Sequence, residues 1–344
     1  MARTRNRTGC GKYIAAENYF NERTTFMKAY LGIDVGSVST NIVVQDQAGK
    51  IHAGLYIRTM GRPIEALLKG LRQVGESLPP DIEIEAAGTT GSGRYLAGVM
   101  VNADVIKNEI TAHAVAASLL VPDVRTVLEI GGQDSKIIIM RNGIVTDFAM
   151  NTVCAAGTGS FLDQQASRLN IPITDFGDLA LSSASPVRIA GRCTVFAESD
   201  MIHKQQMGHS LQDIINGLCE ALVRNYLNNV GKGKEILSPV VFQGGVAANK
   251  GIKAAFERFL NLPVIIPEYH NIMGAIGVAQ LAGEEVRKTG GTKFKGFHIT
   301  GLTYKTGSFE CGGCPNGCEI AEIYEGDRVI GRWGARCQRW DIIN

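Results

Sequence analysis

A pattern of strand, glycine-rich loop, strand and tight turn occurs twice in this chain, and it constrains the fold more than any other feature. The first copy spans residues 30–49. The second copy, over residues 127–150, follows about 95 residues later. Two copies of one unit in a single chain predict two α/β lobes that face each other.

Apolar periodicity and turn residues outline the remaining elements. Pro63 suits the first turn of a helix, and the last fifty residues differ from the rest in having four cysteines and no long helix. A hairpin is expected over 319–333, turning at 325–327. Helices are predicted over 63–77, 156–169, 210–230, 246–260 and 273–288, and further strands over 82–87 and 239–243.

The first glycine-rich loop, residues 32–40, has the chemistry of a phosphate site. Asp34 stands at a strand end, where its carboxylate can hold the waters of a magnesium ion. Gly36 lets the backbone turn closely. Hydroxyl and N–H groups that can donate to phosphate follow at Ser37, Ser39 and Thr40.

Two further loops complete a candidate nucleotide site. Residues 129–136 repeat the first loop, with Gly131, Gly132, Gln133 and Asp134 between two strands. Residues 242–249 deliver Gly244 and Gly245 to a helix start that includes Asn249, a place suited to a sugar and a phosphate. One such loop alone is ordinarily a tight turn, whereas three in this order on a duplicated unit indicate nucleotide binding.

Eight cysteines point to metal rather than disulfides in a cytosolic chain. Cys154 and Cys193 each stand where a helix is expected to begin, a setting that stabilises thiolate; the alternative is two buried structural cysteines. The C-terminal set has the spacing C-x2-C-x3-C-x18-C, and zinc and an iron–sulfur cluster both fit such ligands. This set is Cys311, Cys314, Cys318 and Cys337. Cys10 and Cys219 are not expected to bind metal.

Composition excludes several classes of protein. A net charge of +2 favours neither nucleic acid nor a membrane surface, and no apolar run reaches the ~18 residues of a membrane span. The basic N-terminus lacks the continuous apolar segment of a secretory signal. We therefore expect a cytoplasmic protein.

The three loops resemble the two phosphate motifs and the adenosine motif of the actin, sugar-kinase and heat-shock-chaperone ATPase fold. The resemblance implies a two-lobed α/β fold with duplicated lobes, here followed by a small cysteine-rich β-hairpin module. The expected divisions are an N-terminal extension (1–28), lobe I (29–107), lobe II with the cluster and adenosine loops (108–272), a closing helix (273–290) and the cysteine-rich module (291–344).

Residues 108–114 are similar to the chaperone segment whose glutamate orients the attacking water. The resemblance makes Glu109 the candidate for that role, with Gln133 as the alternative. A glutamate stabilised by the dipole of the helix that it starts is the competing interpretation of Glu109.

From about residue 30 to 288 the chain resembles the activator ATPases of 2-hydroxyacyl-CoA dehydratases and the ATP-hydrolysing subunits of benzoyl-CoA reductases, the BadF/BadG/BcrA/BcrD type. The motifs that carry the resemblance are residues 88–94, the loop 129–136, and the segments around Cys154 and Cys193. It implies one 4Fe–4S cluster, shared across a homodimer by Cys154 and Cys193 of each chain. The arithmetic agrees, because a cubane needs four thiolates and each chain supplies two.

The resemblance implies an ATP-hydrolysing electron donor that accepts electrons from a ferredoxin or flavodoxin. It would pass them singly, at low potential, to a dehydratase or to a double-cubane cluster protein, because the C-terminal module looks like that of double-cubane protein reductases. Two alternatives remain open on the same fold. One is a small-molecule kinase and the other is an ATP-switched binding or assembly protein.

Overall fold

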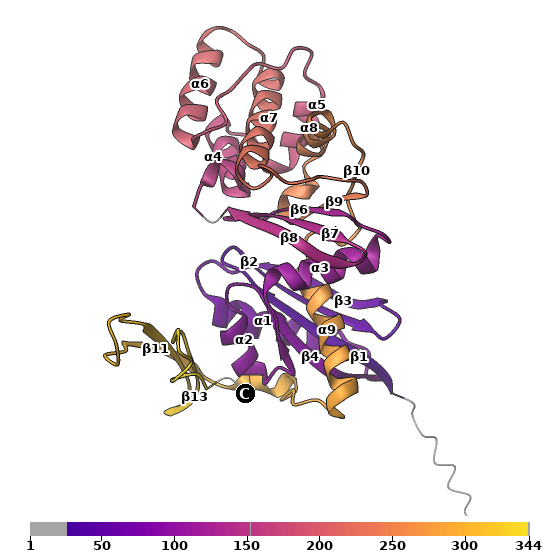
Figure 1. Ribbon diagram of the computed structural model, residues 1–344, viewed down its shortest axis with the longest axis vertical. Helices are drawn as coiled ribbons and strands as arrows, with labels where there is room; N and C mark the ends of the chain where they lie inside the picture. The colour runs from indigo at the N-terminus through magenta and orange to yellow at the C-terminus, as the bar shows by residue number, and fades with distance from the viewer. Residues whose placement is uncertain (1–25, 152, 343–344) are drawn as a thin grey trace, which may run out of the picture.

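The computed structural model describes residues 26–151 and 153–342. Most of the predicted N-terminal extension, including Cys10, lies outside these residues. The chain forms two lobes, each built on a five-stranded sheet, and a separate C-terminal sheet of three strands (Figure 1). No helix in the described part of the chain is long and apolar enough to cross a membrane.

The two large sheets have the same topology, which confirms the duplication predicted from the sequence. In each sheet the third, second and first strands of the lobe are antiparallel neighbours, and the fourth and fifth strands continue parallel to the first. The strands of the first sheet are β1 (Met27–Val35), β2 (Ser39–Asp46), β3 (Ile51–Arg58), β4 (Ile82–Thr90) and β5 (Val105–Ile106). Those of the second are β6 (Thr126–Ile130), β7 (Ser135–Arg141), β8 (Ile144–Asn151), β9 (Val240–Gln243) and β10 (Val264–Ile265).

Helices cover both faces of the first sheet. Helices α1 (Pro63–Ser77) and α2 (Arg94–Val101) share one core with β1 and β2. Helix α9 (Met273–Thr289) packs on the other face of β1 and β4, and also against α3 (Glu109–Leu120). The α3–α9 crossing is close enough that a side-chain carbon at Gly277 would collide with the backbone carbonyl of Ala112.

The second lobe carries the remaining helices, α4 (Gly159–Leu169), α5 (Phe176–Leu181), α6 (Thr194–Gln206), α7 (Leu211–Asn229) and α8 (Lys250–Leu260). Short 3-10 turns occur at η1 (Ala155–Gly157), η2 (Ile173–Asp175) and η3 (Gly245–Ala248). The helices predicted over 156–169 and 246–260 are therefore each a 3-10 turn followed by an α-helix. In the second case Asn249 separates the two, because its side chain caps α8 by accepting the Ile252 N–H at 3.1 Å.

The C-terminal sheet follows a last 3-10 turn, η4 (Phe297–Gly301), and consists of β11 (Tyr304–Glu310), β12 (Glu319–Glu325) and β13 (Arg328–Trp333). The hairpin predicted over 319–333 is present, and β11 is a third, unpredicted strand. Tyr304 and Ile323 join the core of the first lobe, and Trp333 stacks on Tyr95 of α2 with ring centroids 6.4 Å apart. This sheet is thus anchored to the first lobe (Figure 1).

Candidate functional site: a nucleotide cavity between the lobes

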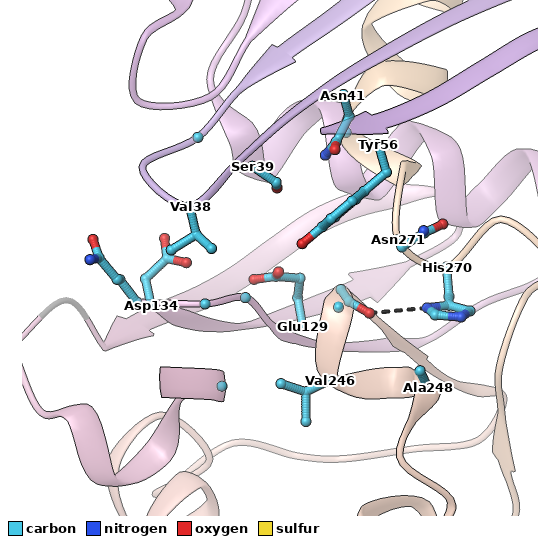
Figure 2. A pocket seen from close by; sticks show the side chains of 18 of the residues that line it. Val38, Ser39, Asn41, Tyr56, Glu129, Asp134, Val246, Ala248, His270 and Asn271 are labelled. Atoms are coloured by element: carbon cyan, nitrogen blue, oxygen red, sulfur yellow. Dashed lines mark hydrogen bonds between the residues drawn. The ribbon is translucent and has the colours of Figure 1, made fainter. Parts of the chain in front are cut away.

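A cavity of about 560 Å³ lies between the two large sheets, and all three predicted glycine-rich loops line it. This volume suits a ligand of nucleotide size. Figure 2 shows Ser39, Asn41 and Tyr56 of the first lobe facing Glu129 and Asp134 of the second. The predicted site residues that line the cavity are Asp34, Gly36, Ser37, Ser39, Glu109, Gly131, Gly132, Gln133, Asp134, Gly244, Gly245 and Asn249.

Thr40 is the predicted phosphate-loop residue that does not line the cavity. Its side chain is fully buried, and its hydroxyl lies 3.0 Å from that of Thr59. Thr59 in turn donates to the Gly36 carbonyl at 3.0 Å. Thr40 therefore supports the first loop indirectly, through Thr59, and does not reach the cavity.

The loops have matching backbone geometry. The Gly36 N–H donates to the Ser39 carbonyl at 2.8 Å, and the Gly131 N–H donates to the Asp134 carbonyl at 3.0 Å. Gly244 has a φ of +90° and lies against the Ile130 carbonyl, so that a side chain there would be strained and crowded. These loops therefore bring main chain, rather than side chains, close to the cavity.

The most highly charged part of the cavity is centred on a buried lysine. Lys136 Nζ lies 2.8 Å from Glu109 Oε2, 3.1 Å from Glu129 Oε2 and 2.8 Å from Asp134 Oδ2. Burial would lower the pKa of Lys136, but the three carboxylates raise it well above its usual value. Lys136 stays charged and ties α3, β6 and the second loop together. Lys136 ends the second predicted loop, but no local sequence feature indicates its role.

Around Lys136, the carboxyl groups of Asp34, Glu109, Glu129 and Asp134 outnumber the one ammonium group. Burial, reinforced by nearby Glu109, raises the pKa of Asp34 to about 7, and burial raises the pKa of Glu129 to about 8. Burial would also raise the pKa of Glu109, but Lys136 holds it below its usual value. Carboxylates in this excess can order the waters of a hard divalent cation such as magnesium, which would lower these pKa values.

A buried histidine also faces the cavity. The ring Nδ1 of His113 lies 2.7 Å from Gln243 Nε2, and the amide nitrogen can only donate, so Nδ1 accepts. Burial, together with the charge of Lys136, lowers the pKa of His113 to about 3. His113 is therefore a neutral hydrogen-bonding group. No local sequence pattern predicts this pair, because its two members are 130 positions apart.

The third loop and the neighbouring helices of the second lobe supply further lining residues. His270 Nδ1 lies 3.1 Å from the Gly244 carbonyl, beside the third loop (Figure 2). The other residues here come from α4, η2, α5 and η3, and no glycine motif signals most of them in the sequence. They are Leu162, Asp163, Ile173, Thr174, Gly177, Val246 and Ala248.

Cys154 and Cys193 lie outside the cavity, at the N-cap positions of η1 and α6. Neither side chain caps its own helix. The Asn225 amide on α7 connects the two loops, because Nδ2 donates to the Gly191 carbonyl at 2.5 Å and lies 4.0 Å from Cys154 Sγ. Both cysteines therefore stand at helix starts, as predicted, and the side-chain amide of Asn225 contacts both of their loops.

The remaining cysteines divide into two groups. Cys219 is fully buried on α7, as expected for a core residue, and burial raises its pKa to about 12. The C-terminal four stand at the end of the three-stranded sheet and outside the cavity. Among residues 26–151 and 153–342, no three His, Cys, Asp or Glu side chains are arranged as a metal-binding group. The metal sites predicted from the sequence thus remain predictions.

Two lobes of one topology with phosphate loops facing across a cleft define this protein as an ATPase of the actin and sugar-kinase fold. A sequence profile of the BadF/BadG/BcrA/BcrD ATPase family matches residues 31–282, and the chain belongs to that family. The match ends before the C-terminal sheet begins.

Characterised relatives support this membership. The (R)-2-hydroxyglutaryl-CoA dehydratase activating ATPase of Acidaminococcus fermentans is 36% identical over 263 residues, covering 75% of this chain and 98% of the relative. The crystal structure of component A of that dehydratase has a TM-score of 0.70 at 33% identity, covering 75% and 99% of the two chains. The ADPNP-bound activator of the 2-hydroxyisocaproyl-CoA dehydratase from Clostridium difficile has a TM-score of 0.68 at 32% identity, covering 76% and 97%.

Proposed function

We propose that this protein is an ATP-hydrolysing iron–sulfur electron donor. It accepts electrons from a ferredoxin or flavodoxin in the cytoplasm and passes them singly, at low potential, to a 2-hydroxyacyl-CoA dehydratase or a double-cubane cluster protein. Support comes from relatives that are named as dehydratase activators, one of them with bound ADPNP. The cavity supports the first half of this activity, ATP hydrolysis, and the two cysteine loops support the second half, electron transfer.

In the nucleotide half, the first two loops would hold the phosphates and the third the adenosine, and Asp34 would order the waters of a magnesium ion. Glu109 orients the attacking water. It lines the cavity, and its contact with Lys136 keeps it ionised and able to accept a hydrogen bond. Gln133, the alternative, is exposed at the rim. The geometry therefore favours Glu109.

In the electron-transfer half, Cys154 and Cys193 of two chains hold one 4Fe–4S cluster, which supplies one-electron chemistry when bound. Both thiols are partly exposed, and they stand at the N-cap positions of η1 and α6. Next to them lie three strongly exposed apolar side chains, with Val153 95%, Val195 67% and Phe196 64% exposed. A second copy of the chain would cover this surface and supply the other two thiolates.

The single observation that carries the proposal is a short path between the two halves. On α7, the Tyr226 hydroxyl donates to the Lys136 carbonyl at 2.6 Å, while its neighbour Asn225 contacts both cysteine loops. A second path runs through α4. The N–H of Gly159, its first residue, donates to the Gly131 carbonyl at 2.9 Å, and η1, which has Cys154 at its N-cap, lies just before α4 in the chain. Movement of the second phosphate loop with nucleotide would therefore move the cysteine loops.

The test compares a Cys154→Ala/Cys193→Ala variant with a Cys311→Ala/Cys318→Ala control, both purified without oxygen. We expect the first to lack the iron and acid-labile sulfide of the wild type, to become monomeric by light scattering, and to bind ADP normally. The control should keep its iron and its dimer. If the first variant keeps wild-type iron, sulfide and dimer, the proposed cluster site is wrong.

A further inference from the structure

Arg58, the last residue of β3, lines the nucleotide cavity but takes no part in the charge cluster around Lys136. Among the described residues that line the cavity, these two are the only lysine or arginine side chains. Lys136 already contacts the carboxylates of Glu109, Glu129 and Asp134. Arg58, in contrast, is exposed and forms no salt bridge within the part of the chain that the structure describes. Its charge is therefore available to a ligand.

The backbone holds Arg58 beside the first phosphate loop. Arg58 lies opposite Ser39 in the ladder between β2 and β3, and Ser39 stands where the loop passes into β2. The next residue, Thr59, ties the end of β3 to the loop with two hydrogen bonds. Its N–H donates to the Val38 carbonyl at 2.8 Å, and its hydroxyl donates to the Gly36 carbonyl at 3.0 Å. The main chain of Arg58 therefore has a defined position next to the loop.

The direction of β3 places Arg58 at the phosphate end of the cavity. Alternate residues of a strand share a face, so Arg58 is on the same face as Tyr56, which faces the second lobe in Figure 2. The Tyr56 hydroxyl lies 3.8 Å from where a side-chain carbon at Gly245 would be, beside the third loop. Arg58 is two residues closer to the first loop. There the two phosphate loops meet, because a side-chain carbon at Gly132 would lie 2.5 Å from Val38 Cγ2.

The charge balance of the cavity requires a cation at this end. A nucleoside triphosphate adds negative charge to a site where carboxyl groups already outnumber the ammonium group of Lys136. A magnesium ion offsets only part of that charge. A guanidinium group can donate two parallel hydrogen bonds to the oxygens of one phosphate. Because ADP lacks the γ-phosphate, a cation that binds this group distinguishes ATP from ADP.

We propose that Arg58 binds the γ-phosphate of ATP from the first lobe and is the residue by which the site distinguishes ATP from ADP. This role rests on the proposed function, since it belongs to the same hydrolysis. When water bonds to the γ-phosphorus and the bond to the leaving ADP oxygen breaks, the guanidinium stabilises the charge on the transferred group. Arg58 is on the first lobe and the loop 129–136 is on the second. Loss of the γ-phosphate therefore removes a link between the lobes.

The test compares Arg58→Gln with Arg62→Gln in the full-length protein with magnesium. Arg62 is a matched control, because its side chain is 71% exposed and pairs with Glu65 outside the cavity. By calorimetry, Arg58→Gln should bind ADP with wild-type affinity but a non-hydrolysable ATP analogue about 10- to 100-fold more weakly. Its kcat for ATP should fall about 10³-fold. The control should match the wild type in all three measurements.

A third variant separates charge from geometry. Arg58→Lys keeps the positive charge but loses the two-pronged donor, so it should recover part of the analogue affinity and part of the rate. Wild-type affinity for the analogue in Arg58→Gln, or equal weakening of ADP and the analogue, would overturn the proposal. The binding measurements do not need hydrolysis. A wild-type protein that binds the analogue but does not hydrolyse ATP would therefore contradict the proposed function and leave the role of Arg58 to be decided by the two affinities.

Discussion

Replacing Lys136 with methionine tests whether this one cation holds the nucleotide cavity together. Methionine keeps much of the side-chain length but leaves Glu109, Glu129 and Asp134 without the ammonium group that lies 2.8–3.1 Å from each. Removing one partner of a buried ion pair costs about 3–5 kcal/mol of folding free energy. We expect a loss of that size at pH 8, where Glu109, whose pKa Lys136 holds below its usual value in the wild type, loses its counter-charge.

The loss should be smaller in mild acid. Lys136 holds the pKa of Glu109 below its usual 4.5 against the effect of burial, so removing Lys136 lets burial raise this pKa. Above pH 4.5 the folded variant then binds a proton at Glu109 that neither the unfolded chain nor the folded wild type binds, so its free energy of unfolding falls relative to the wild type as pH rises. One pKa unit corresponds to about 1.4 kcal/mol. We therefore expect a cost of about 1–2 kcal/mol at pH 5.5.

Urea unfolding without nucleotide, followed by circular dichroism at both pH values, measures these costs. Lys250→Met is the matched control, because Lys250 and its partner Asp178 are each 66% exposed and such a pair is worth about 0–1 kcal/mol. A Lys136→Met cost that equals that of the control, or that does not change between pH 5.5 and 8, would refute the reasoning.

Three further variants test the site and the lobe packing. Asp34→Asn should reduce the steady-state ATPase rate at least ~100-fold, because it removes charge that orders magnesium and its waters; a near-normal rate argues against this role. Glu109→Gln should bind ATP with wild-type affinity by calorimetry but hydrolyse it about 10²–10⁴-fold more slowly, and hydrolysis at the wild-type rate would make Gln133 the next candidate. Gly277→Ala should cost at least about 1–3 kcal/mol in thermal unfolding, since its new carbon collides with α3. Gly291→Ala, in open space, should cost little, and equal costs would contradict the packing argument.

The local features of the site could be predicted from sequence, because they depend on residues close together in the chain. Glycines after apolar strands predicted the loops at Gly36, Gly131 and Gly244, and all three line the cavity. The helix starts at Cys154 and Cys193 were likewise predictable, although a strand precedes only Cys154 and the chain before Cys193 is irregular.

Features that depend on the meeting of distant segments could not be predicted. Lys136 binds Glu109 only because α3 crosses the second sheet, and nothing local in the sequence marks that crossing. The pairs His113 with Gln243 and Tyr226 with Lys136 have the same origin. Strand β11 escaped prediction because its exposed residues give only a weak alternation of apolar and polar positions.

The midpoint potential of the Cys154/Cys193 cluster in different nucleotide states tests the central claim most directly. It would be measured by redox titration with EPR detection, without nucleotide, with ADP and with a non-hydrolysable ATP analogue. If nucleotide moves the cysteine loops through Asn225 and Gly159, linkage requires the cluster potential and nucleotide affinity to change together. We predict a shift of ~60 mV or more, which corresponds to about tenfold in affinity or ~1.4 kcal/mol. Three identical potentials, with identical partner affinity in the three states, would contradict an ATP-driven electron donor.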